Sequence, residues 1–118
     1  MTIAKGRSFL FIVLLCLHTS VAKAEENTRV DLDRVCSQIY DMAKLIMELR
    51  QQELPMTRMM AMISDGMADQ PELAQEIARQ TVMDAYELFP YAGAEAQERG
   101  SKAFANRKSS ECYKRFGN

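Results

Sequence analysis

Histidine and tryptophan are almost missing from this chain of 118 residues, which holds one histidine and no tryptophan. The histidine, His18, falls in an N-terminal segment that we expect to be removed on export. A mature chain without imidazole has no histidine general base, no histidine-activated serine or cysteine nucleophile and no histidine metal ligand. The sequence therefore predicts a protein that is not an enzyme and that uses no metal or other cofactor.

The chain also lacks a hydrophobic run long enough to cross a membrane. Its most apolar stretch, FLFIVLLCL at residues 9–17, has nine residues, whereas a spanning helix needs about 20. Two basic residues precede this stretch, and AKA at residues 22–24 has the small-x-small pattern that signal peptidase recognises. We predict that residues 1–24 are a cleaved export signal and that residues 25–118 form the mature domain. The protein would then be periplasmic or secreted, without a stable membrane anchor.

Cysteine is scarce as well. Of the three cysteines, Cys16 belongs to the predicted signal, which leaves Cys36 and Cys112. An even cysteine count in a short exported domain usually indicates disulfides, and the chain has no C-x-x-C motif of the kind found in redox sites. We predict a structural disulfide between Cys36 and Cys112, with a redox or thiolate site as the alternative. By constraining the unfolded chain, such a long loop would stabilise the domain by about 4.5 kcal/mol.

Charge of either sign is unevenly spread along the mature chain. Residues 25–98 carry 15 acidic and 6 basic side chains, whereas residues 99–118 carry 1 acidic and 6 basic side chains. This pattern is typical of a basic last helix that packs against acidic neighbours, or of a site for an anionic partner. Few aromatic residues accompany the basic ones, so the sequence does not predict a nucleic-acid partner.

Apolar residues recur at spacings of three and four along most of the mature chain, which is the pattern of amphipathic helices. It predicts helices over about residues 30–53, 55–66, 71–89 and 94–116. The apolar stripe of the first predicted helix consists of Leu32, Val35, Ile39, Met42, Ile46 and Leu49. Prolines near the starts of the second and third helices and just after the third mark their limits. We predict one all-α domain, a small bundle of about four helices closed by one disulfide, with antiparallel first and last helices as neighbours.

Two local features refine this prediction. Asp69 and Glu72 have the spacing of a capping box at the start of the third helix. In the last helix, apolar and small residues fall on two nearly opposite sides, which predicts a helix that changes partners along its length or bends. One side carries Ala96, Gly100, Ala103, Phe104 and Arg107, and the other carries Ala105, Cys112 and Phe116.

Methionine is the residue type in excess, because five of the nine methionines lie within PMTRMMAMISDGM at residues 55–67. At 100° per residue, four of these and Ile63 share one helix face, whereas Met62 points elsewhere. Methionine suits irregular gaps in a core and adaptable binding grooves, and an isoleucine within the face disfavours a metal site. Core packing is the favoured interpretation, followed by a binding groove and then by a Cu(I) site. The candidate partner-binding residues are Met56, Met59, Met60, Met62 and Met67.

Three stretches of the chain carry a family resemblance. The segment CSQIYDMAKLIMELRQQELPMTRMM, followed by TVMDAYELF and ECYKRF, resembles a group of small exported proteins of bacteria and their phages with one early and one late cysteine. This resemblance covers about residues 35–116 and implies a disulfide-closed helical fold, without an assigned activity. A looser likeness, of class alone, is to acid-activated periplasmic chaperones, which are also exported, helical and held by one disulfide.

Together these features predict a non-enzymatic periplasmic or secreted protein that binds another protein through a methionine-rich apolar face. The alternative is an acid- or stress-responsive holdase chaperone, because neutralising the carboxylates at low pH leaves the basic groups unopposed. A soluble Cu(I)-binding protein is the third hypothesis.

Overall fold

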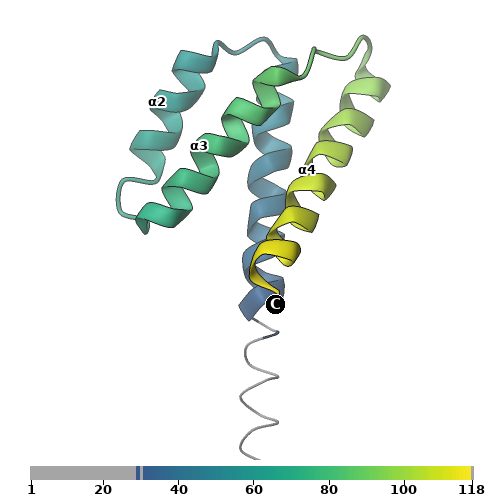
Figure 1. Ribbon diagram of the computed structural model, residues 1–118. Helices are drawn as coiled ribbons and strands as arrows, with labels where there is room; N and C mark the ends of the chain where they lie inside the picture. The colour runs from purple at the N-terminus through teal and green to yellow at the C-terminus, as the bar shows by residue number, and fades with distance from the viewer. Residues whose placement is uncertain (1–28, 30, 118) are drawn as a thin grey trace, which may run out of the picture. The chain divides into compact units, whose positions relative to one another are not determined.

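The computed structural model describes residues 29 and 31–117 (Figure 1). The predicted signal, residues 1–24, lies outside this part of the chain. The chain divides into two units, one that ends at Arg34 and one that begins at Val35. In the first unit, Arg34 forms an ion pair with Asp31 at 3.0 Å. The second unit contains the bundle and every contact discussed below.

Four helices and no strand make up the described part of the chain. The first helix spans residues 31–51, and it is followed by α2 (Met56–Gly66), α3 (Glu72–Glu87) and α4 (Ala94–Phe116). The all-α prediction is confirmed, and the predicted bounds agree with the observed ones to within two residues. Prolines account for much of this agreement, since Pro55 and Pro71 take the N-cap positions of α2 and α3.

The helices of the bundle run alternately up and down (Figure 1). The α2 and α3 helices form an antiparallel hairpin, and α4 lies antiparallel to the first helix. A disulfide joins Cys36, near the start of the first helix, to Cys112, near the end of α4, with the Cα atoms 5.6 Å apart. The predicted disulfide and the pairing of the first and last helices are therefore confirmed.

The core draws on all four helices. The first helix contributes three side chains at a spacing of three or four, as expected for one helix face. Packed around them are residues of α2, α3 and α4, so the buried cluster consists of Ala43, Ile46, Met47, Met59, Val82, Ala85, Phe104 and Ala105.

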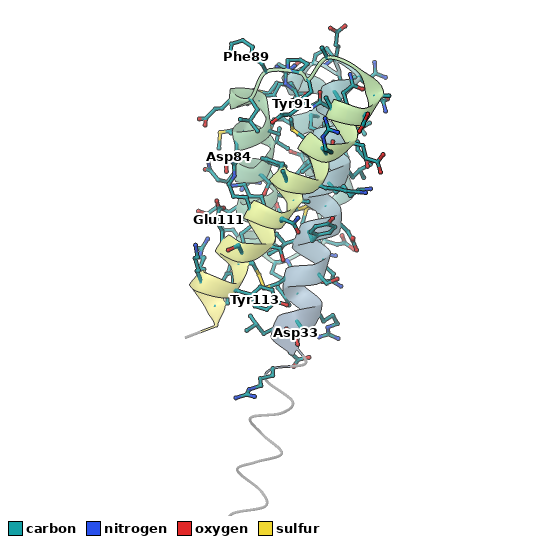
Figure 2. The ribbon with its side chains drawn as sticks, turned by 90° about the vertical axis from the view of Figure 1, so that its right-hand side faces the viewer. Asp33, Asp84, Phe89, Tyr91, Glu111 and Tyr113 are labelled. Atoms are coloured by element: carbon teal, nitrogen blue, oxygen red, sulfur yellow. A yellow bond between two sulfur atoms is a disulfide. The ribbon has the colours of Figure 1, made fainter. Side chains whose placement is uncertain are left out.

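Polar contacts hold the loops at the end of the bundle away from the disulfide. Arg50 donates to the carbonyl of Leu88 at 3.3 Å, and the amide oxygen of Gln51 accepts from Tyr91 N at 2.8 Å. The Tyr91 ring covers Gly100 of α4 so closely that a Cβ there would collide with the ring. Figure 2 shows Phe89 pointing away from the same loop, and this side chain is 88% exposed.

The predicted capping box at α3 is wrong. Pro71 takes the N-cap position with φ −54°, and no side chain of the described residues caps this helix. The helix therefore begins two residues later than a cap by Asp69 requires. Glu72 instead lies in the first turn, where its negative charge favours the positive end of the helix dipole.

The two opposed faces predicted for α4 are also wrong. This helix is continuous over 23 residues, and Ala103, Arg107 and Phe116 are exposed. One stripe is buried instead, and it consists of Gly100, Ser101, Phe104, Ala105, Lys108 and Cys112. At 100° per residue Lys108 lies at the centre of this stripe. The spacing of apolar residues does not predict this buried stripe, because the side chain at its centre is charged.

Candidate functional site

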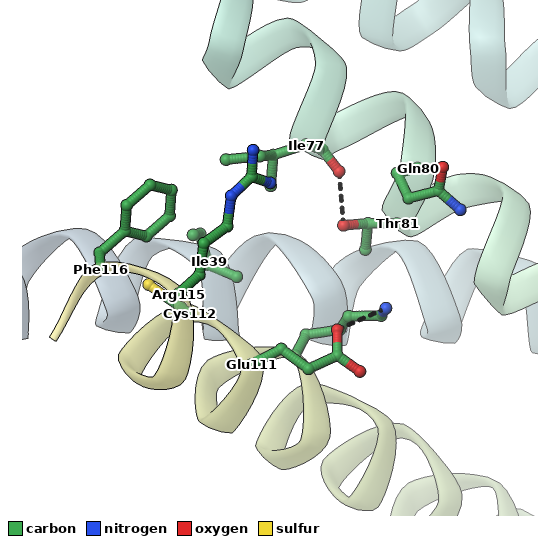
Figure 3. A pocket seen from close by; sticks show the side chains of 9 residues that line it. Ile39, Ile77, Gln80, Thr81, Glu111, Cys112, Arg115 and Phe116 are labelled. Carbon is green, nitrogen blue, oxygen red and sulfur yellow. Dashed lines mark hydrogen bonds and ion pairs between the residues drawn. The ribbon is translucent and has the colours of Figure 1, made fainter. Parts of the chain in front are cut away.

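A largely apolar groove lies between the first helix, α3 and α4 at the disulfide end of the bundle. It consists of two adjoining hollows of about 130 and 170 Å³, and Ile39 and Ile77 line both. Figure 3 shows the hollow of about 130 Å³. The first hollow lies beside the disulfide and is further lined by Gln80, Thr81, Lys108, Glu111, Cys112, Arg115 and Phe116. The second extends to the α2–α3 turn and is further lined by Val35, Gln38, Met42, Met67, Gln70 and Ala74.

The apolar stripe of the first helix explains why the groove is there. Ala43 and Ile46 are buried in the core, whereas Ile39 and Met42, about one turn earlier, are half-buried. Val35, a further turn back, is 40% exposed. Burying apolar surface adds about 25 cal/mol per Å² to the free energy of unfolding. Where the stripe enters the groove, part of its apolar surface stays exposed and makes no such contribution. The first helix therefore presents more apolar surface than its own bundle covers.

An ion-pair cluster forms the polar wall of the first hollow. Lys108 of α4 is 9% exposed, and its Nζ donates to Asp84 of α3 and to Glu111 at 2.9 Å. The other carboxylate oxygen of Asp84 accepts a hydrogen bond from Gln80 at 2.9 Å. Lys108 thus joins α3 to α4 directly beside the groove.

The surroundings of this cluster favour its charged form. Burial acts to raise the pKa of Asp84, but hydrogen bonds from Lys108 and Gln80 and the charges of Lys108 and Arg107 hold that pKa below its ordinary value. Burial acts to lower the pKa of Lys108, but its bonds to Asp84 and Glu111 and their charges raise it overall. At neutral pH, both Asp84 and Lys108 are therefore ionised and the link between α3 and α4 is intact.

The α4 end of the groove carries a cation and an exposed ring. The Arg115 side chain extends from α4 toward Ile77 (Figure 3), and its guanidinium carbon lies 5.2 Å from the centre of the Phe116 ring. Within the described ranges, no carboxylate lies within 4.0 Å of Arg115. An aromatic face stabilises a cation only partly, so Arg115 retains charge that a ligand in the groove would meet.

The five candidate methionines do not form one surface. Met59 is buried in the core, Met60 packs against it, and Met67 lines the second hollow of the groove. Met56 and Met62 are exposed and lie outside the groove. The methionine-rich segment therefore contributes mainly to the core and supplies one residue to the groove.

Sequence reasoning did not single out the other groove residues as a site. Ile39 and Met42 belong to the predicted apolar stripe, which by itself predicts a core. The signal available in the sequence is the length of that stripe, which reaches back to Val35, about two turns before Ala43, where the core cluster begins. The sequence places Phe116 on a separate face of the last helix, so it does not predict that Phe116 lines a hollow with Ile39 of the first helix.

Three further findings bear on function. In the described part of the chain, no helix is long and apolar enough to span a membrane. Among the same residues, no group of three or more histidine, cysteine, aspartate or glutamate side chains is arranged to hold a metal ion. No protein-family model, curated protein or solved structure matches the chain. The function is therefore inferred from the residues of the groove.

Proposed function

We propose that this protein is an exported, non-enzymatic interaction module whose groove binds an apolar segment of another protein. The observation that supports the proposal most strongly is the continuation of the core stripe of the first helix into the groove, through Met42 and Ile39 to Val35. Concentrated exposed apolar surface with a polar rim is typical of protein-binding sites. The disulfide beside the groove fixes two of its walls before a partner arrives, which lowers the entropic cost of binding.

Export is part of the same proposal. The predicted signal at residues 1–24 supports it, and so does the Cys36–Cys112 disulfide, because such bonds persist in oxidising compartments. The mature sequence after residue 24 contains no histidine, which removes the commonest general base of secreted enzymes. Recognition, rather than catalysis, is the proposed role.

A second candidate function, an acid-responsive holdase, is favoured by the ion pair beside the groove. Acid would neutralise the carboxylates of the chain and leave its basic groups unopposed. Protonation of Asp84, at the acid end of that range because its pKa is lowered, would also remove the charge that holds Lys108 of α4 against α3. The helices would then separate at the groove and expose more apolar surface, while the disulfide kept the chain together. Suppression of a client's aggregation at about pH 3 to 4, with none at pH 7, is the expected behaviour; acid unfolding without client protection would eliminate this function.

Site-specific photo-crosslinking tests the interaction function. A photoreactive amino acid is placed at Val35 in the groove, or at Leu45 on the same helix, in the exported protein within living bacteria. Both native side chains are apolar and exposed, but only Val35 lines the groove. We expect a discrete crosslinked product from position 35 that position 45 does not give.

Two controls complete that experiment. Phe116 in the other hollow should give the same product as Val35, because both positions line one groove. A product of equal yield from Leu45, or none from either groove position, would contradict the proposed function.

A further inference from the structure

We infer that the groove of one copy of this protein receives the Phe89 ring of a second copy, so that copies associate head to tail. The inference rests on the groove being a protein-binding site, as proposed above, and names a second copy as an occupant that competes with the partner. Two features carry it. Phe89 is an exposed ring on a fixed loop at one end of the bundle, and the groove at the other end matches that ring in size and charge.

Phe89 is the most exposed large apolar side chain of the described residues. It is 88% exposed, and it points away from the loop that carries it (Figure 2). Leu88, just before it, packs against the core, and Pro90, just after it, restricts Phe89 to extended backbone conformations. A ring left in water in this way forgoes the free energy that its burial would provide.

The loop is held on both sides of this ring. The Leu88 carbonyl accepts a hydrogen bond from Arg50, and Tyr91 N donates to the amide oxygen of Gln51 at 2.8 Å. The Gln97 side chain donates to the Tyr91 carbonyl at 3.1 Å. Because the ring is presented by a fixed loop, its insertion into a partner costs little ordering entropy. Aromatic anchors of this kind supply much of the binding energy of protein interfaces.

The charge around Phe89 favours a protein pocket over a lipid surface. Residues 80–98, on either side of the ring in the sequence, include four acidic side chains and no basic one. Peripheral membrane proteins add lysine and arginine to their apolar anchors, because membrane surfaces are negatively charged. A lone ring with acidic neighbours lacks that attraction.

The second hollow of the groove is suited to an aromatic ring. Its volume is about 170 Å³, and no charged residue lines it. An apolar cavity of about 150 Å³ is large enough to bind benzene. Met42 and Met67 line this hollow with flexible thioether side chains, which adapt to the shape of a guest and make favourable contacts with aromatic rings.

Charge complementarity favours a second copy as the source of the ring. Arg115, which has no carboxylate partner, lines the first hollow, and that hollow adjoins the second along Ile39 and Ile77. Glu87, two positions before Phe89, is exposed, and no lysine or arginine in the described part of the chain lies within 4.0 Å of it. With the ring in the second hollow, the Glu87 carboxylate can pair with the Arg115 guanidinium. Such a pair fixes orientation and selects between partners.

The two surfaces lie at opposite ends of the bundle. Phe89 belongs to the α3–α4 loop, whereas the groove lies beside the Cys36–Cys112 disulfide at the other end (Figure 1). A contact between two different surfaces of identical chains runs head to tail, and it continues into open chains or closes into rings. One ring and one ion pair make a contact smaller than the roughly 1,200 Å² of a stable interface. We therefore expect weak, reversible association with a Kd of about 0.1–1 mM.

Two complementary variants of the mature oxidised protein test the inference. Phe89→Ser removes the ring and leaves the groove, whereas Val35→Glu places a charge in the groove and leaves the ring. Sedimentation velocity is measured from about 10 µM to about 1 mM, a range that spans the expected Kd. Wild type should form species that grow with concentration, and each variant alone should stay monomeric. An equimolar mixture should form a dimer of one copy of each variant that grows no further, because it retains one ring and one groove.

Leu45→Ser is the matched control, because Leu45 is 56% exposed on the first helix and lines neither hollow. This variant should associate like wild type. Formation of the mixed dimer also shows that Phe89→Ser and Val35→Glu are both folded.

A charge exchange tests the contact between Glu87 and Arg115. Arg115→Glu should weaken self-association about fivefold, the upper range for an exposed ion pair. Adding Glu87→Arg to the same chain should restore the association, because the exchanged pair again has opposite signs. Equal association of wild type and both variants would overturn the charge complementarity on which the choice of occupant rests.

The outcomes separate the inference from the function beneath it. Wild type that stays monomeric at about 1 mM would overturn the inference, and a Val35 crosslink to a different protein would still support the proposed function. A dimer that Phe89→Ser retains and Val35→Glu abolishes would mean that two grooves pack together, and it would overturn the inference as well. So would Phe89-dependent binding to phosphatidylcholine–phosphatidylglycerol vesicles without self-association. The mixed dimer, with no Val35 crosslink to any other protein, would support the inference and limit the groove to self-association.

Discussion

Removing the Asp84 carboxylate should destabilise the bundle more than removing any exposed acidic residue. In Asp84→Ala, the Lys108 ammonium stays buried and keeps Glu111 as its carboxylate partner. Breaking a fully buried ion pair costs about 3–5 kcal/mol. The Asp84 side chain is 21% exposed and Glu111 partly compensates, so we expect a loss of about 2 kcal/mol of unfolding free energy at pH 7.

A double-mutant cycle isolates the pair. Lys108→Met retains most of the aliphatic volume and removes the buried charge. We expect it to lower the free energy of unfolding by about 1 kcal/mol, because Asp84 loses its cationic partner. In the double variant with Asp84→Ala, neither charge remains. Its loss of unfolding free energy should therefore be well below the sum of the losses in the two single variants. Urea denaturation of the oxidised protein, followed by circular dichroism, provides the four free energies.

The pH dependence of the same variant follows from the direction of the pKa shifts. The pKa of Asp84 is held below its ordinary value of 3.8. The ionised carboxylate therefore contributes fully to the free energy of unfolding above about pH 3.8, and this contribution is lost as the pH falls through the lower pKa of the folded state. The pKa of Lys108 is raised above 10.5, so its contribution is lost only as the pH rises beyond that value. Wild type and Asp84→Ala should therefore differ by a constant amount at pH 5 to 9 and converge in strong acid.

Two results would refute this reasoning. One is a stability loss at pH 7 no larger than that of Glu98→Ala, which breaks an exposed pair on α4 and should leave stability unchanged within error. The other is a gap between wild type and Asp84→Ala that persists undiminished at pH 2.

Other features of the bundle give three further predictions. Replacing Cys36 and Cys112 by serine should lower the unfolding free energy by about 4.5 kcal/mol, and thiol titration of the untreated protein should find no free thiol. Met59→Ala should cost about 2–5 kcal/mol in denaturation because the side chain is buried, and a Cu(I) competition assay should detect no tight site in the parent protein. Gly100→Ala should destabilise by about 1–3 kcal/mol because the new Cβ meets an aromatic ring, whereas Gly66→Ala, with open space around it, should stabilise slightly.

Much of the fold could be predicted from the sequence because its signals are local. Proline positions and the spacing of apolar residues located all four helices, and two cysteines in the mature chain allow one intramolecular pairing. The buried stripe of α4 was missed for an equally physical reason. Lys108 pairs its charge with Asp84, which lies 24 positions away on another helix. The spacing of residues within α4 cannot reveal such a partner.

The groove could be predicted only in part. The stripe from Val35 to Ile46 was visible in the sequence, but the residue at which it leaves the core depends on how far α3 covers the first helix. That coverage is a tertiary property, set by contacts between residues far apart in the chain. The same limit applies to the methionine-rich segment, where Met59 of α2 lies in the core and Met67, directly after the end of α2, lines the groove.

Methyl NMR of the methionines tests the central claim most directly, because the groove and the exposed part of α2 each carry such probes. The oxidised protein, labelled at methionine methyl groups, is titrated with a synthetic amphipathic helical peptide. If the groove is the binding surface, the signals of Met42 and Met67 shift in a saturable manner while those of Met56 and Met62 stay in place. Saturable shifts at Met56 and Met62, with Met42 and Met67 unchanged, would contradict the account.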